Sequence, residues 1–323
     1  PILSPLGDTK NGPRLLYFAG ALLCGGGIML MSVVESPWQY YLIFGGMIGL
    51  ARYFIQVAHN VIPKWFIINR GPAMAWASAG SGIGPLIFPY PIQLLISTVG
   101  WRDAWLYLGV LALVLLLLGS LFIRTSPEDV GLKPDGHKLP EKIHPPLTNH
   151  LDISDEYSYT RYEALRTQLF WLVLLSVTLG TLGMNGFNPV VVPFLHDSGF
   201  SPDIAALSVT AYASIAILMR FGWGIMTKRV TSRAAFMLQC SIAGIAVLLL
   251  YFVWNAPTLI LAMMLVGFAF GGFWVLQGVM IANYFGRRHI AGVRGLIQPF
   301  QTAAGSGGPL IFGIIFDFSG TYA

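Results

Sequence analysis

Nine long apolar runs, each nearly free of charge, constrain this chain more than any other feature of its sequence. Each run is long enough for a helix to cross the ~30 Å hydrocarbon core of a bilayer. The runs cover residues 15–34, 39–62, 71–98, 104–123, 167–195, 204–227, 234–256, 258–282 and 295–316. Because only 10% of the residues are charged, an ordinary soluble domain is excluded. The sequence therefore predicts an all-α, multi-pass integral membrane protein in contact with the lipid bilayer.

Lysine and arginine are distributed unevenly between the loops that join these runs. Basic loops stay preferentially in the cytoplasm, and here alternate loops hold nearly all of the basic residues. One of these loops, residues 125–166, is rich in proline and charge, and we interpret it as a cytoplasmic linker. Its end, YEALRTQ, could form a short interfacial helix or a plain loop. The net charge of +5 then reflects topology, so we expect no nucleic-acid partner.

One phrase occurs twice: AGSGIGPLIF at residues 79–88 returns as AGSGGPLIF at residues 304–312. The basic loops KNGPR and RVTSR are related in the same way, with their first residues 219 positions apart. Small residues let helices pack closely, and glycine with proline can bend a membrane helix. We therefore interpret the phrase as a hinge and packing surface that is present twice because half of the protein is duplicated.

The repeat unit contains six runs, and an even number of spans makes the two copies parallel. This predicts an N-terminal helical half at 1–124, the linker at 125–166 and a C-terminal helical half at 167–323. If both copies are complete in the intact protein, the nine runs belong to about twelve spans, with the first half truncated at its start and the second at its end.

Several motifs carry a family resemblance: KWFIINRGPAMAWASAGSGIGP at 64–85, GWRDAW at 100–105, SPEDVGLKPDG at 126–136, NYFGRRHIAGVRG at 283–295 and GPLIFGIIFDFSGTY at 308–322. Together they resemble the major facilitator superfamily, in the branch of monocarboxylate transporters and bacterial oxalate:formate antiporter-like proteins. The resemblance implies two parallel six-helix halves, a plasma-membrane location and a monomer. It also implies secondary active transport of a small organic anion, with a monocarboxylate expected and with a coupling proton or a counter-anion as the co-transported ion.

The resemblance also points to two gating loops, which match the superfamily pattern G-x-x-x-D-[RK]-x-G-x-[RK] in part. The matching residues are Lys10, Gly12 and Arg14 in the first copy and Gly224, Arg229 and Arg233 in the second. In the first copy Asp8 stands one residue before the position of the acid, and in the second Lys228 replaces it. We therefore expect gating to depend on contacts other than the family's usual charge pairs.

Two arginines, Arg52 and Arg220, lie inside apolar runs that contain no Asp or Glu. An ionised side chain at mid-membrane costs at least ~2.5 kcal/mol. An anionic substrate would supply a partner, because guanidinium binds a carboxylate through two parallel hydrogen bonds. The alternative is that each arginine binds backbone carbonyls at a helix break, or an acid on a helix outside this sequence.

The family resemblance sharpens the expectation for Arg220. Monocarboxylate transporters have an arginine four residues before the glycine of this loop, as Arg220 precedes Gly224. They also have an acid four residues earlier, where this chain has Ala216, so the obvious proton carrier is missing. The lysine of oxalate:formate antiporters in the eleventh helix has no counterpart, and Gln298 and Gln301 are the polar groups there. A monoanion is therefore expected over a dianion.

Other polar residues of the runs are weaker candidates for substrate contact. Arg52, Gln56, His59 and Asn60 would share one face of a helix. His59 is a candidate proton-linked residue, because histidine titrates near neutral pH, although its place near the inner end favours an interfacial histidine.

Asn185 and Asn188 also share a face, beside Pro189, which could interrupt the helix; they would contact substrate or bond to a neighbouring helix. Tyr212, Gln277 and Gln298 complete the set of candidate substrate contacts.

Motifs for nucleotide, zinc or acyl-transfer chemistry are missing from the sequence, so we expect no enzyme, no cofactor and no metal. A membrane enzyme is the second hypothesis. A transporter of another small solute, or a transporter-like protein that senses a carboxylate without moving it, remains a further alternative.

Overall fold

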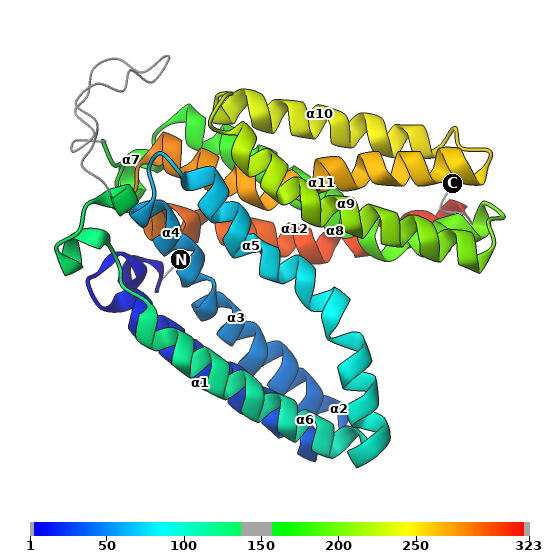
Figure 1. Cartoon of the computed structure of the whole chain (residues 1–323), viewed down its shortest axis with the longest axis horizontal. Coiled ribbons are helices and arrows are strands. Elements are labelled where there is room, and N and C mark those ends of the chain that lie inside the picture. Colours follow the sequence, from blue (N-terminus) through cyan, green and yellow to red (C-terminus); the bar gives the residue numbers. More distant parts are fainter. Residues whose placement is uncertain (1–2, 137–156, 320–323) are drawn as a thin grey trace. The chain divides into compact units, whose positions relative to one another are not determined.

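The computed structural model describes residues 3–136 and 157–319, and all regular elements there are helical (Figure 1). The α-helices are α1 (Gly12–Leu30), α2 (Pro37–Tyr40), α3 (Gly49–Ile55), α4 (Val57–Trp65), α5 (Arg70–Ile87), α6 (Pro89–Phe122), α7 (Arg161–Leu165), α8 (Gln168–Asp197), α9 (Pro202–Met226), α10 (Ser232–Leu250), α11 (Ala256–Phe285) and α12 (Ile290–Ser319). Short 3-10 helices cover Ser4–Asp8, Met31–Val33, Pro127–Val130 and Pro134–Gly136, and a π-helix covers Tyr41–Ile48. The expected all-α architecture is confirmed.

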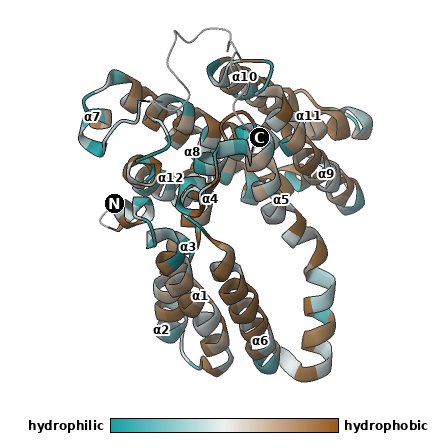
Figure 2. Ribbon diagram, turned by 60° about the vertical axis from the view of Figure 1, so that its left-hand side comes forward, coloured by the Kyte–Doolittle hydropathy of each residue, from teal (hydrophilic) through white to brown (hydrophobic). Residues whose placement is uncertain are grey.

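Seven described helical stretches combine the length and hydropathy needed to cross a membrane. They are Gly12–Val33, Pro37–Trp65, Pro89–Phe122, Gln168–Asp197, Pro202–Met226, Ser232–Leu250 and Ala256–Phe285. Of the two other predicted runs, 71–98 covers α5 and the beginning of α6, and 295–316 falls on α12. Figure 2 shows apolar residues along most of the long helices. This suits a bilayer, where a helix satisfies its own backbone groups.

The runs 71–98 and 104–123 are divided differently from the expectation. Helix α5 ends at Ile87, and α6 begins at Pro89, a residue that favours the first turn of a helix because it lacks an N–H group. Within α6, Gly100 has φ 83°, a conformation that suits glycine. The loop expected between the two runs is therefore reduced to a break at this one glycine.

The run 39–62 was expected to be one regular helix and is instead a series of joined helical segments. Helix α2 leads into the π-helix Tyr41–Ile48, then α3, and then α4. Gln56 separates α3 from α4; its N–H bonds to the carbonyl of Arg52, and its own carbonyl accepts from the N–H of His59. The bond from His59 spans three residues instead of four, so the backbone turns more tightly here, while Gln56 keeps helical φ and ψ of -62° and -17°.

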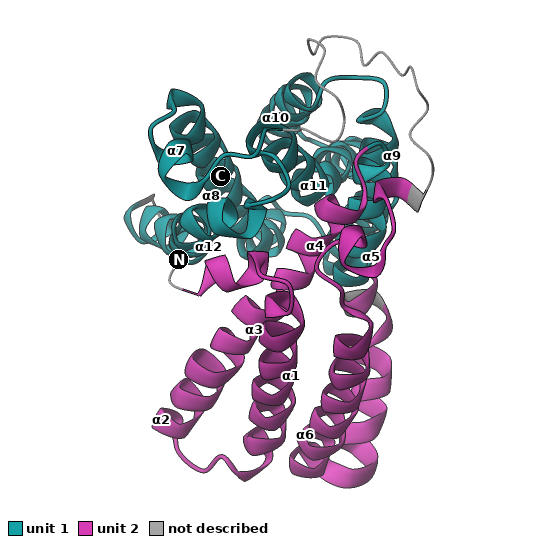
Figure 3. Cartoon of the chain, turned by 90° about the vertical axis from the view of Figure 1, so that its left-hand side faces the viewer, with its two compact units in different colours: residues 1, 68–82, 153–323 teal, residues 2–67, 83–152 magenta. Residues whose placement is uncertain are grey.

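The chain forms two compact units, coloured in Figure 3. Unit 2, residues 2–67 and 83–152, contains α1 to α4 and α6. Helix α1 packs on α6 through glycine, since Gly25 leaves no room for a side chain beside Leu113 and Gly109 leaves none beside Met29. Small residues thus allow the close helix approach that a membrane interior favours.

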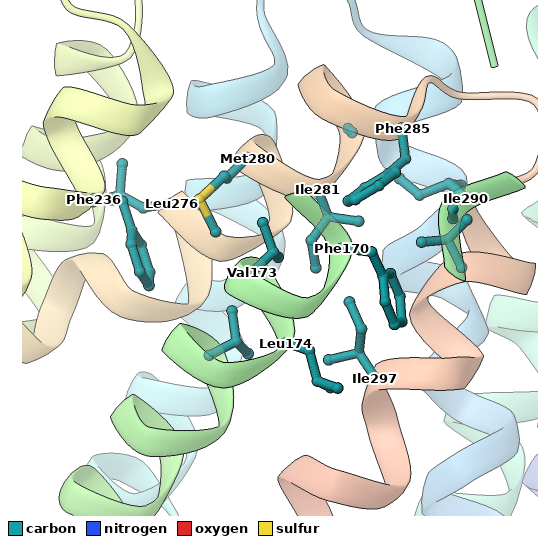
Figure 4. Packing of buried hydrophobic residues seen from close by; sticks show 14 of the residues in the cluster. Phe170, Val173, Leu174, Phe236, Leu276, Met280, Ile281, Phe285, Ile290 and Ile297 are labelled. Carbon is teal, nitrogen blue, oxygen red and sulfur yellow. The ribbon is translucent and has the colours of Figure 1, made fainter. Parts of the chain in front are cut away.

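Unit 1, residues 1, 68–82 and 153–323, contains α7 to α12 together with most of α5. Its core joins Phe170 and Leu174 of α8 to Leu276 and Phe285 of α11 and to Ile297 of α12 (Figure 4). In the second copy of the repeated phrase, Gly308 lies against the backbone of α8 at Leu182 and Gly186. That copy is a packing surface, as expected.

The predicted linker, 125–166, is described at its two ends, and residues 137–156 lie outside the described part of the chain. The end that was ambiguous in the sequence forms the short helix α7, which begins at Arg161. Thr160 caps it, since its hydroxyl oxygen accepts from the N–H of Glu163. In return, the N–H of Thr160 donates to Glu163 Oε2 at 2.8 Å. This hydrogen bond favours the ionised carboxyl and lowers the pKa of Glu163.

Candidate functional site

The guanidinium of Arg220 on α9 lies against α5 within unit 1. Its Nη1 donates to Ser81 Oγ at 2.8 Å and to the backbone carbonyl of Ser78. Ser81 Oγ in turn donates to the same carbonyl at 2.8 Å. These three groups form a closed hydrogen-bonded triangle in which the serine hydroxyl accepts from arginine and donates to the helix backbone.

The acceptors around Arg220 are neutral. No Asp or Glu of the described residues forms an ion pair with it. One of the two expectations for this arginine, binding to a backbone carbonyl, is therefore observed, although α5 is regular at Ser78 and Ser81. Since a carbonyl and a hydroxyl carry no net charge, the positive charge of Arg220 stays uncompensated by these contacts.

Close packing of α5 on α9 brings these groups together. Gly82 lies over the arginine: a Cβ there would be 3.1 Å from Arg220 Cζ and 2.8 Å from Ile217 Cγ1. Gly71 and Gly224 face each other so closely that a side chain on either would meet the backbone of the other. The first copy of the repeated phrase thus contacts Arg220, a role that the packing interpretation missed.

Arg52, the other predicted cation, lies in the last turn of α3 in unit 2 and is exposed. Gln56, His59 and Asn60 follow it, and each is partly buried. The structure therefore tests neither the role of Arg52 in substrate binding nor a proton-linked role for His59.

The asparagines of α8 form hydrogen bonds within their own helix and to the neighbouring helix α9. Asn188 Oδ1 accepts from the Tyr212 hydroxyl of α9 at 3.1 Å, which is the interhelical bond foreseen as one alternative. The amide groups of Asn185 and Asn188 donate at 2.9 Å to carbonyls one turn earlier in α8, at Thr181 and Met184. Helix α8 continues through Pro189 to Asp197, so the predicted interruption at this proline is not present.

A second polar group joins α11, α12 and α8 inside unit 1. Gln277 Nε2 donates to Gln301 Oε1 at 3.1 Å, and Gln301 Nε2 donates to Thr181 Oγ1 at 3.2 Å. All three side chains are buried. Gln277 therefore bonds to Gln301, whereas Gln298, the residue predicted for the site on that helix, is partly exposed. Thr181 was missed because a threonine in an apolar run carries no signal of its own.

The first predicted gating loop is held within unit 2 by contacts on both sides. Asp8 Oδ1 forms an ion pair with Lys64 Nζ at 2.8 Å. The Thr125 hydroxyl donates to the carbonyl of Lys10 at 2.5 Å. The acid that stands one residue early in the pattern therefore still has a cationic partner, at the end of α4. Gly12 and Arg14 follow in the first turn of α1.

The second predicted gating loop follows α9 in unit 1. The Thr227 hydroxyl donates to the carbonyl of Gly224 at 2.7 Å, and Arg229 and Arg233 are exposed.

Sequence reasoning did not single out Arg70 of α5, which is buried and donates to Asn283 Oδ1 of α11 at 2.8 Å. Among the residues that the structure describes, no cluster of His, Cys, Asp or Glu is suited to a metal ion.

Comparisons with known proteins agree on one class. A family model described as Major Facilitator Superfamily matches residues 1–309. MFS transporter asaE of Aspergillus flavus is 29% identical over 332 residues, covering 100% of this chain and 69% of that protein. Monocarboxylate transporter 2 of Homo sapiens is 25% identical over 328 residues, covering 97% of this chain and 68% of that protein. The chain thus spans about two thirds of the length of these relatives.

A solved structure extends the agreement to the fold. The E. coli fucose:proton symporter FucP aligns with a TM-score of 0.70 at 13% sequence identity, covering 99% of this chain and 82% of that chain. At this level of identity, the likeness concerns the arrangement of the helices alone.

Proposed function

The chain belongs to the Major Facilitator Superfamily, and we propose that it moves a small organic anion across a membrane by alternating access as a secondary active transporter. Membership and the apolar helices make it a multi-pass membrane protein of a transporter family. We propose a monocarboxylate as the substrate, the plasma membrane as its location, a cytoplasmic linker and a monomeric state.

The observation that carries the proposal is the uncompensated charge of Arg220. This arginine lies in an apolar helix, and its described contacts are a carbonyl and a hydroxyl. A cation among apolar helices is costly unless a functional partner meets it. A substrate carboxylate would supply the opposite charge and two matching acceptor oxygens.

A single negative charge fits this site better than two. Arg220 is the one cation of α9 inside the span, and Ala216 one turn earlier leaves no acid beside it. One guanidinium neutralises one carboxylate, and a second carboxylate would need a further cation. Monocarboxylate transporter 2 among the relatives supports the same substrate class.

The test is uptake of radiolabelled monocarboxylates by proteoliposomes that contain the full-length protein, with and without a pH gradient. We expect concentrative uptake by the wild type and a loss of at least about a hundredfold in Arg220→Gln, as expected when a charge-assisted pair is removed. Arg102→Gln is the control, because Arg102 is exposed and its Cζ lies 4.3 Å from the centroid of the Trp101 ring. Equal counterflow by wild type and Arg220→Gln would remove the assignment of this residue.

The same assay separates the alternatives. A carboxylate sensor would bind the labelled anion without accumulating it inside the vesicle. A transporter of another solute would take up no carboxylate into the vesicles, whereas a wider substrate screen would find uptake of a different compound. A dependence of uptake on the pH gradient would identify a coupling proton, and dependence on internal anion would identify exchange.

A further inference from the structure

Ser81 occupies a special place in the triangle around Arg220. Its hydroxyl accepts from Arg220 Nη1 and donates to the carbonyl of Ser78, each at 2.8 Å. A hydroxyl group can do both at once because it has one donor hydrogen and two lone pairs. The same carbonyl also accepts directly from Nη1. The guanidinium is therefore anchored at one nitrogen by two groups of α5.

Guanidinium geometry then decides what remains for a ligand. The group is planar and has five N–H donors in a fixed fork. With Nη1 held by α5, the opposite edge keeps the Nε and Nη2 hydrogens side by side, and neither nitrogen bonds to another described residue. Two parallel donors of this kind match the two oxygens of one carboxylate.

We propose that Ser81 is a positioning residue that fixes the Arg220 guanidinium so that its Nε and Nη2 edge receives a single substrate carboxylate. The inference rests on the proposed function, because it concerns the same arginine. It adds a residue on another helix, 139 positions earlier in the chain, that determines affinity without touching the substrate.

Gly82 completes the arrangement. A methyl group at this position would lie 3.1 Å from Arg220 Cζ and 3.2 Å from Nη1, closer than ordinary van der Waals contact. The absent side chain lets the guanidinium lie close to α5 while Ser81 accepts from its Nη1. The pair Ser81 and Gly82 thus forms a seat for the arginine.

The transport test compares Ser81→Ala, Ser81→Thr and Ser176→Ala in proteoliposomes. Ser176 is the control because it also bonds to a carbonyl of its own helix, at Leu172, but is exposed and contacts no arginine. We expect Ser81→Ala to raise KM for a monocarboxylate roughly tenfold with little change in kcat, as for loss of a charge-assisted bond. Threonine keeps the hydroxyl, so Ser81→Thr should restore most of the affinity.

A second readout follows the arginine itself and needs no transport. The arginine reagent phenylglyoxal should modify Arg220 several times faster in Ser81→Ala than in wild type or Ser176→Ala, as measured by peptide mass spectrometry. The inference would be overturned if Ser81→Ala kept the KM and the labelling rate of the wild type. It would also be overturned if Ser176→Ala changed both quantities as much as Ser81→Ala does. If wild type transports no carboxylate, the proposed function fails, while the labelling rate still decides whether Ser81 holds Arg220.

Discussion

Asp8 and Lys64 form an ion pair in unit 2, with 2.8 Å between Asp8 Oδ1 and Lys64 Nζ and with only 12% and 5% of the two side chains exposed. The pair joins the loop before α1 to the last turn of α4. It gives the first predicted gating loop a charge contact despite its displaced acid.

We predict that Asp8→Asn destabilises the protein by about 3 kcal/mol, because removing one member of a buried pair leaves the other charge without its counter-ion. Thermal unfolding in detergent measures this. The charge swap Asp8→Lys with Lys64→Asp should recover part of the loss, and the exposed Asp103→Asn should have no effect. A melting temperature unchanged in Asp8→Asn would contradict the prediction.

Gly82→Ala should reduce carboxylate uptake at least about fivefold, since the added methyl group displaces the Arg220 guanidinium and overpacking costs roughly 1–3 kcal/mol. Gly80→Ala is the matched control, because a Cβ at Gly80 meets nothing within 4 Å. Uptake measured at saturating and low substrate distinguishes lost affinity from lost turnover. Equal activity of the two variants would show that the space at Gly82 is unimportant.

The buried amide group of α11 and α12 should contribute to the stability of unit 1. Gln301→Leu removes the acceptor of Gln277 and the donor to Thr181, and we expect a loss of about 1–3 kcal/mol per buried group left unpaired. The measurement is thermal unfolding against Gln93→Leu, an exposed glutamine of α6. The prediction fails if both variants melt together with wild type.

Tyr212→Phe separates the two roles considered for Asn188. The hydroxyl of Tyr212 donates to Asn188 Oδ1, so its removal should cost about 1 kcal/mol of stability if the pair is an interhelical bond alone. In that case KM for the substrate stays unchanged. A rise in KM without loss of stability would instead assign the Tyr212–Asn188 pair to the substrate.

Much of the fold follows from apolar length and from the repeat. The nine runs locate the long helices because a chain in lipid must bond its own backbone groups, which a helix does within one segment. The details inside a run depend on neighbours and on special residues. Gly100 divides α6 and Gln56 separates α3 from α4, whereas Pro189 leaves α8 continuous.

The candidate site shows the same division. Arg220 was singled out because an arginine is costly in an apolar run. The partner of Asn188 was foreseen only as one of two alternatives, and the seat of Arg220 was not foreseen. Ser81 and Gly82 resemble any small residues of a packed membrane helix, so their sequence pattern indicates packing and nothing more.

The sequence by itself determined an all-helical membrane protein with a duplicated half. It also determined that Arg220 lies in an apolar run, where its charge requires a polar or anionic partner. Both follow because hydrophobic length and the cost of buried charge act on each segment alone. The tertiary structure decided which neutral groups receive that arginine. Residues 139 positions apart meet at Arg220 because glycines let α5 and α9 approach closely. Contacts of this range depend on how two helices pack, which no single segment encodes.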